Sequence, residues 1–110
     1  MTKFIGVETV LAYLMTKRTK TTVSVIELNK VIVELKREAN KQHLSVAFLS
    51  SRSDIDNCLM DYNEYYSPIL SDNGNIVSIT LKSNKTFDEL EKTFIKPLPE
   101  EVKPLLEEVD

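Results

Sequence analysis

The sequence is poor in the residues that build catalytic and metal sites. Among its 110 residues are one His (His43), one Cys (Cys58), two Gly and no Trp. These counts exclude a zinc site made of several His or Cys side chains. With Gly only at positions 6 and 74, the glycine-rich loops that hold nucleotide phosphates are also absent. We therefore expect no enzymatic activity, no metal and no cofactor.

Long apolar runs and export signals are lacking as well. The sequence has no run of 18 apolar residues, which predicts no transmembrane helix and no membrane association. Glu8 and Thr9 interrupt the region where a signal peptide has its apolar core. A single Cys forms no intrachain disulfide. These features predict one cytoplasmic domain, residues 1–110, with Cys58 as a small buried hydrophobe and His43 as a partly exposed residue at a helix end.

Cations are missing from one long stretch. Residues 53–81 contain no Lys, Arg or His, yet they contain five acidic side chains. Residues 1–52 carry nine Lys or Arg against four acids, whereas residues 53–110 carry five against thirteen, which gives the net charge of −3. Such an asymmetry indicates two faces with different partners, self-association of opposite faces, or a mixed surface kept soluble by charge.

Apolar periodicity predicts two helices in the first half of the chain, over residues 3–18 and 25–42. The first has a conventional apolar face, composed of Phe4, Val7, Val10, Leu11, Leu14 and Met15. Its opposite face is uncharged and is composed of Ile5, Thr9, Ala12, Tyr13 and Thr16. Such a helix is either buried on two sides or uses the second face for self-association.

Ser24 and Glu27 have the spacing of a capping box at the start of the second helix. Its broad apolar face is composed of Val25, Leu28, Val31, Ile32, Leu35 and Ala39. Ile26 and Val33, seven residues apart, form a narrower second stripe on this helix. Residues 44–49 are compatible with a strand, an extended linker or a helical turn.

The second half predicts a short helix and a hairpin. Ser53 and Asp56 have N-cap spacing for a helix over residues 54–63. Strands follow at 65–70, where Pro68 requires an edge position, and at 76–82, where Val77, Ile79 and Leu81 share one face. The Asp-Asn-Gly sequence at 72–74 predicts the turn between them.

A C-terminal helical segment follows the hairpin. Thr86 and Glu89 have capping-box spacing, and Phe87, Leu90 and Phe94 form one helical face that ends before Pro97. A last helical pattern is composed of Val102, Leu105, Leu106 and Val109. Pro104 lies inside it, so either a helix starts near Pro104 or two short turns meet there.

These elements predict a mostly helical α+β fold. Their order, and the predicted turn at 72–74, resemble a winged helix-turn-helix domain over residues 3–82, with residues 83–110 as a C-terminal helical extension. The resemblance implies that residues 54–63 form the helix that reads DNA and that residues 65–82 form the wing. Two departures are the long second helix and the extra segment at 44–49, where a tight turn is expected.

The charge of the predicted reading helix opposes DNA binding, because affinity for DNA depends mainly on cations that contact phosphates. We therefore expect a small non-enzymatic regulatory module, such as an inhibitor or adaptor, that docks an acidic surface on a basic partner protein. The expected partner-binding residues are Asp54, Asp56, Asp61, Tyr62, Glu64 and Tyr65.

A DNA-binding transcriptional regulator that uses the basic N-terminal half is the alternative. Its expected nucleic-acid contacts are Lys17, Arg18, Lys20, Lys30, Arg37, Lys41 and Arg52. Such a protein would form a homodimer through the first helix or the residues after Thr86. An accessory subunit of an enzyme, or a structural part of an assembly, is a third interpretation.

Overall fold

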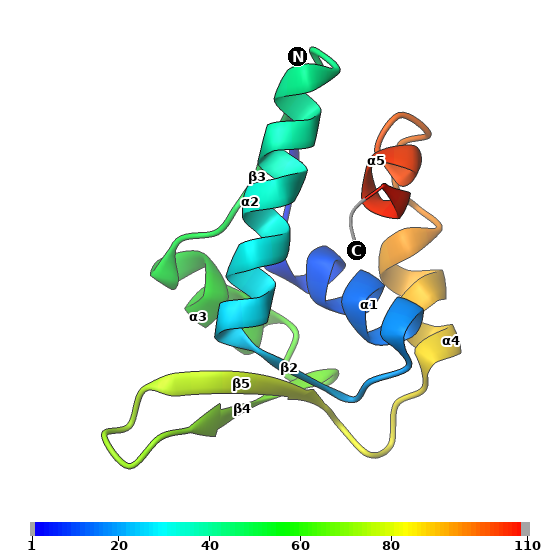
Figure 1. Cartoon of the computed structure of the whole chain (residues 1–110). Coiled ribbons are helices and arrows are strands. Elements are labelled where there is room, and N and C mark those ends of the chain that lie inside the picture. Colours follow the sequence, from blue (N-terminus) through cyan, green and yellow to red (C-terminus); the bar gives the residue numbers. More distant parts are fainter. Residues whose placement is uncertain (1, 109–110) are drawn as a thin grey trace.

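The computed structural model describes residues 2–108 and has a mixed α+β fold of helices with a small antiparallel sheet (Figure 1). Val109, expected in the last helical segment, lies outside the described residues. The helical elements are α1 (Val7–Arg18), α2 (Val25–Lys41), α3 (Arg52–Asp61), α4 (Phe87–Leu90), the π-helical segment η1 (Glu91–Ile95) and α5 (Lys103–Glu107). The strands are β1 (Lys3–Ile5), β2 (Thr22–Ser24), β3 (Val46–Phe48), β4 (Tyr66–Leu70) and β5 (Ile76–Leu81).

The strands form two small sheets. β5 lies between β2 and β4 in an antiparallel sheet of order β2-β5-β4, and β1 pairs in parallel with β3. Pro68 lies on β4 opposite Ile79, at the sheet edge as predicted. The strand after the first helix is therefore hydrogen-bonded to the second strand of the hairpin, which brings both halves of the chain together beneath α1 and α2 (Figure 1).

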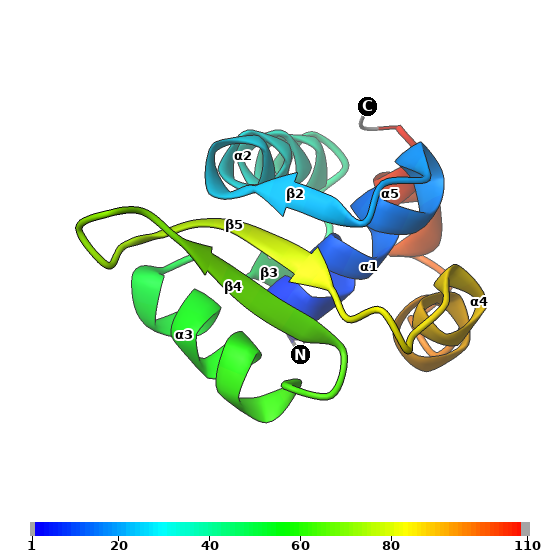
Figure 2. The ribbon, with the colours of Figure 1, turned by 90° about the horizontal axis from the view of Figure 1, so that it is seen from below.

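Helix α1 lies at the centre of the fold. The uncharged second face is buried, since Thr9, Ala12 and Tyr13 are at most 8% exposed. On this side α1 contacts α4 and η1, and it also contacts α2, α3 and β2 (Figure 2). Burial on two sides is thus the correct one of the two predicted explanations, and α1 offers no uncharged outer face for self-association.

The predicted start of the first helix was wrong. Residues 3–5 form β1, which pairs with Val46, Ala47 and Phe48, and the helix begins only after Gly6. Phe4, predicted on the apolar helical face, is 68% exposed. Within the ambiguous segment 44–49, the pairing makes residues 46–48 a strand, an outcome that depends on a contact some 40 residues away in the chain.

Helix α2 agrees with the prediction within one residue. Ser24 caps it, because the Glu27 backbone N–H donates to Ser24 Oγ at 3.1 Å. The residues of its predicted apolar face are buried except Val25, which is half-buried. The narrower stripe is exposed, since Ile26 and Val33 are 71% and 51% accessible.

Helix α3 begins and ends two residues earlier than predicted. Its cap is Ser51 with Asp54, and not Ser53 with Asp56. The Asp54 N–H donates to Ser51 Oγ at 3.1 Å, and the Ser51 N–H donates to Asp54 Oδ2 at 2.9 Å. This reciprocal pair satisfies two N–H groups at the helix start, which explains why α3 begins at Arg52 and not two residues later.

The hairpin has the predicted turn, in which Gly74 adopts a positive φ of 80°. Ile79 and Leu81 are buried beneath the helices, as expected. Val77 is exposed, although it shares their side of the strand. It lies nearer the tip of the hairpin, which projects beyond the helices (Figure 1).

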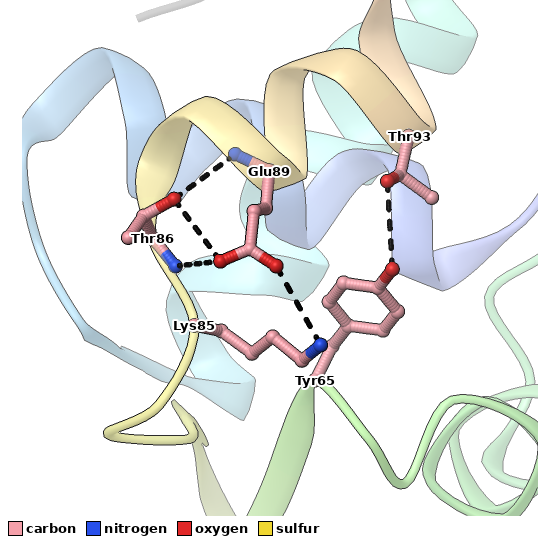
Figure 3. A network of polar contacts seen from close by, with 5 residues as sticks. All are labelled: Tyr65, Lys85, Thr86, Glu89 and Thr93. Carbon is pink, nitrogen blue, oxygen red and sulfur yellow. Dashed lines mark hydrogen bonds and ion pairs between the residues drawn. The ribbon is translucent and has the colours of Figure 1, made fainter.

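The C-terminal extension packs on the same hydrophobic core. The capping box of Thr86 and Glu89 is present, and the helix continues as η1 to Ile95, two residues before Pro97 (Figure 3). The last helix, α5, begins beside Pro104, which selects the first of the two predicted arrangements. Its buried residues, Leu105 and Leu106, contribute to the core, and α5 contacts α2. Among residues 2–108, no helix has the length and apolar character needed to cross a bilayer.

Candidate protein-binding face

The outward side of α3 and the turn after it carry three of the six predicted partner-binding residues. Ile55 and Cys58 point into the core, so the opposite side of the helix faces solvent. We define the α3 face as five exposed residues of α3 and of the turn after it, namely Asp56, Asn57, Met60, Asp61 and Glu64. Met60 is 72% exposed, the largest exposed fraction among the large apolar side chains of the described residues. The face therefore combines a flexible apolar side chain with three carboxylates.

Asp54 has a structural role. Its hydrogen bonds with Ser51, from the side chain first and then from the backbone, lower the pKa of the Asp54 carboxyl. Because the carboxylate is engaged in the capping box at the start of α3, it is poorly placed to pair with another protein. Asp54 stays a prediction as a partner contact, but the geometry explains it as a helix cap.

Tyr62 and Tyr65 belong to an aromatic cluster. Both rings lie edge-on to Phe94, with centroid separations of 5.3 and 5.2 Å, and Tyr66 stacks on the same ring at 6.0 Å. Tyr62 and Tyr65 are half-buried, and burial raises the pKa of Tyr62. These tyrosines hold η1 against the end of α3, and only their outer edges border the α3 face.

Polar contacts reinforce this attachment on the other side of Tyr65 (Figure 3). The Tyr65 hydroxyl lies 3.5 Å from Thr93 Oγ1, and Lys85 Nζ lies 4.7 Å from the centre of the Tyr65 ring. Lys85 also approaches Glu89 at 3.6 Å, which links the ring to the cap of α4. The position of Tyr65 is therefore defined by contacts within the chain.

A cleft of about 480 Å³ lies beside the α3 face, between α2, α3 and the tip of the hairpin. Val25, Ile55 and Ile76 supply its apolar lining, and Asp56 lies among its polar lining residues. Arg52 Nη2 donates to Asn75 Oδ1 at 3.0 Å, which joins the start of α3 to the hairpin tip. Asp56 therefore belongs both to the α3 face and to the wall of this cleft.

The seven residues predicted to contact nucleic acid lie on α1, α2, the start of α3 and the loop before β2, and many have acidic or polar neighbours. Arg18 forms an ion pair with Glu27, and Lys20 Nζ lies 3.8 Å from the same carboxylate. Lys41 Nζ lies 4.0 Å from Glu38. Local pairing thus reduces the positive potential of this set.

Three further cations of that set lie on α1 and α2, and the seventh, Arg52, donates to Asn75 at the hairpin tip. Lys17 Nζ lies 5.3 Å from the centre of the Tyr13 ring. Lys30 and Arg37 are exposed on the outer side of α2, near Ile26 and Val33, and these four residues line one shallow apolar depression. Lys30 also lines a second depression together with Arg18 and Lys20, so the structure brings part of the predicted basic set together around α2.

Cys58 and His43 occupy the kinds of position predicted for them. Cys58 is buried, and burial, aided by the nearby carboxylates of Glu8 and Asp61, raises the pKa of its thiol to about 12. His43 is exposed just after α2 and adopts a positive φ of 55°. Within residues 2–108, no three His, Cys, Asp or Glu side chains are grouped closely enough to hold a metal ion.

Sequence reasoning missed Met60 and the cleft. Helical spacing from Ile55 and Cys58 places Met60 on the outer side of α3, so the first was detectable from sequence. The cleft is formed by α2, α3 and a hairpin tip some 20 residues further on, and no local pattern encodes it. Comparisons with protein-family models, curated proteins and solved structures gave no match.

Proposed function

We propose that this protein is a small non-enzymatic binding module that docks its α3 face on a basic surface of a partner protein. The observation that carries the proposal is Met60, an apolar side chain 72% exposed on a helix whose other outward side chains include Asp56 and Asp61. Met is common at adaptable binding surfaces because its side chain is flexible and polarizable. Carboxylates around it favour a partner with Lys or Arg at the rim of an apolar pocket.

The expected energies divide between these residues. Burial of the Met60 side chain contributes about 1.5–3 kcal/mol, which corresponds to a factor of about ten or more in Kd. The carboxylates at the rim add less affinity, but they accelerate association with a basic partner and disfavour acidic ones. A partner surface that otherwise binds nucleic acid has this chemistry, which supports a role as an inhibitor or adaptor.

Site-specific cross-linking tests the proposal. A photoreactive amino acid replaces Met60 in the full chain, and a second version carries it at the exposed Lys92 on η1 as the control. In extracts of the native host, we expect a protein adduct from position 60 that is lost with Asp56→Lys. Equal adducts from both positions, or adducts only with nucleic acid, would contradict a protein-binding α3 face.

A winged-helix DNA-binding regulator is the second candidate, favoured by the arrangement of the elements. What supports this candidate is the order of three helices followed by a hairpin, on which the resemblance rests. In the usual docking mode α3 enters the major groove, where Asp56 and Asp61 would approach phosphates. Cations of the N-terminal half, at the end of α1 and on α2, would support another docking mode, and Lys20, Lys30 and Arg37 among them are exposed.

A gel-shift assay with random duplex separates the two candidates. Binding that weakens steeply with salt and is abolished by the triple substitution Lys17, Arg18 and Lys20→Ala would favour the DNA-binding candidate. The module proposed first predicts no such shift, and it predicts that Met60→Lys leaves any residual DNA binding unreduced. A homodimer stays part of the second candidate, since dimers contact two half-sites.

A further inference from the structure

The outer side of α2 carries a stripe of alternating chemistry. Ile26, Lys30, Val33 and Arg37 are spaced four, three and four residues apart and are all exposed, so they lie along one side of the helix. Together they line a shallow, mainly apolar depression. We define these four residues as the α2 stripe. Along the stripe, Val33 lies between the cations Lys30 and Arg37, and Ile26 precedes Lys30.

The α2 stripe has the chemistry expected of the partner for the α3 face. Along α3, Asp56 precedes Met60 by four residues, an axial distance of about 6 Å. Along α2, Val33 precedes Arg37 by four residues and follows Lys30 by three, which gives axial distances of about 6 and 4.5 Å. If Met60 contacts Val33, Asp56 therefore comes opposite a cation, whichever way the two helices run.

We propose that the α3 face of one copy binds the α2 stripe of a second copy. This inference rests on the proposed function, because it names the partner of the same face. Charge complementarity favours a second copy as the occupant: residues 1–52 carry a balance of +5 and residues 53–110 a balance of −8. The contact joins different surfaces of the two molecules, so each copy retains one face for a further neighbour or for a reciprocal contact.

Glu34 provides an internal check on the charges. It is exposed on the flank of the stripe and lines the same depression as Lys30 and Arg37. Its carboxylate would oppose those of an incoming α3 face. Removal of this negative charge in Glu34→Gln is therefore expected to strengthen the association. A substitution that only damaged the fold or the solubility would not strengthen a specific contact.

The association is expected to be weak. Two single helical faces bury an area at the low end of specific interfaces, so we expect Kd values of about 10 µM to 1 mM. Because the charged pairs are near solvent, high salt should weaken the association. Sedimentation equilibrium of the full chain over that concentration range, at low and high salt, measures both effects.

Two single-face variants make the test specific. Asp56→Lys combined with Met60→Lys removes the α3 face and leaves the α2 stripe intact. Lys30→Glu combined with Arg37→Glu does the opposite. All four positions are exposed, and circular dichroism of each variant checks that it is folded. Each variant alone should be monomeric at concentrations where the natural chain associates, and an equimolar mixture should regain a complex, because each supplies the face that the other lacks.

The outcomes are distinct. A monomeric natural chain at about 1 mM would overturn the inference, because the expected Kd range would then be exceeded. If the α2 variant were monomeric but the α3 variant still associated, the contact would join two α2 stripes, and the inference would also be overturned. Cross-linking from position 60 to a different protein, with a monomeric natural chain, would retain the proposed function and remove only the second copy as the partner.

Discussion

Two tyrosines, Tyr66 and Tyr13, are buried, and within the part of the chain that the structure describes the hydroxyl of the first is hydrogen-bonded whereas that of the second is not. The Tyr66 hydroxyl donates to the Glu8 backbone oxygen at 2.8 Å, and Tyr66 is 1% exposed. The Tyr13 hydroxyl is also buried, but among the described residues it has no hydrogen-bond partner. Replacement of Tyr by Phe removes only the hydroxyl group, so the two variants report on hydrogen bonding with little change in packing.

We expect Tyr66→Phe to lower the free energy of unfolding by about 1 kcal/mol, the net contribution of a typical hydrogen bond. The loss is not larger because the Glu8 oxygen is in the first turn of α1 and keeps its intrahelical bond. We expect Tyr13→Phe to raise the free energy by up to about 1 kcal/mol, because burial of an unpartnered hydroxyl is unfavourable.

Urea denaturation followed by circular dichroism measures both changes. Shifts of about 0.5–1 M in the midpoint, in opposite directions, correspond to these energies for a domain of this size. In a thermal scan, each kcal/mol corresponds to roughly 4 °C in Tm. A destabilised Tyr13→Phe would refute the reasoning, because it would mean that the Tyr13 hydroxyl forms a favourable bond. If Tyr66→Phe left the free energy of unfolding unchanged, the hydrogen bond to Glu8 would contribute nothing to stability, which would also contradict the reasoning.

Four further predictions concern caps, backbone, charge and reactivity. Ser51→Ala should destabilise the fold by about 1 kcal/mol in urea titrations while Ser53→Ala changes stability by less than about 0.5 kcal/mol, because only Ser51 caps α3. Thr19 has a φ of 51° beyond the end of α1, so Thr19→Gly should raise the thermal midpoint. The pKa of Asp54 is lowered by folding, so its contribution to stability is present above the pKa of the unfolded state and is lost as the pH falls through the lower folded value. Stability measured against pH should therefore fall less in acid for Asp54→Asn than for the natural chain. Because the Cys58 thiol is buried and its pKa is about 12, iodoacetamide at neutral pH should modify it only when urea unfolds the chain, and rapid reaction of the native protein would contradict this.

The elements that sequence predicts well are those with strong local patterns. Helix α2 has both a capping box and an apolar face, and its observed bounds differ from the prediction by one residue. The hairpin turn depends on Gly74, whose positive φ is a local requirement. The capping box at Thr86 is equally local. In each of these cases the residues that determine the conformation lie within a few positions of one another.

The errors arise where distant residues decide the outcome. Residues 3–5 have helical periodicity, but pairing with residues 46–48 makes them a strand. Tyr62 and Tyr65 stay predictions as partner contacts, but sequence reasoning missed their edge-on packing against Phe94, some 30 residues away. Ser51 with Asp54 and Ser53 with Asp56 have the same capping spacing, so spacing alone does not show which pair starts α3. The reciprocal hydrogen bonds between Ser51 and Asp54 identify the first pair as the cap.

Shape and charge give opposite indications for α3, and their magnitudes decide between them. In chain order α3 lies between α2 and the hairpin, and the resemblance to a winged helix-turn-helix domain implies that such a helix docks into DNA. A carboxylate held about 4 Å from a phosphate is disfavoured by about 1 kcal/mol even in water, and Asp56 and Asp61 both lie on the outer side of the helix. Arg52, the cation at the start of α3, donates to Asn75 within the chain.

Those same carboxylates become favourable when the approaching surface is cationic. Met60 then gains burial in place of exposure to a polar groove, and its 72% exposed side chain provides most of the apolar area available on α3. A partner with cations about one helical turn from an apolar side chain satisfies both requirements at once, and Lys30, Val33 and Arg37 of another copy have this spacing. This is why we propose a protein surface and not DNA as the partner of α3: Asp56 and Met60 would each find an energetically favourable counterpart there.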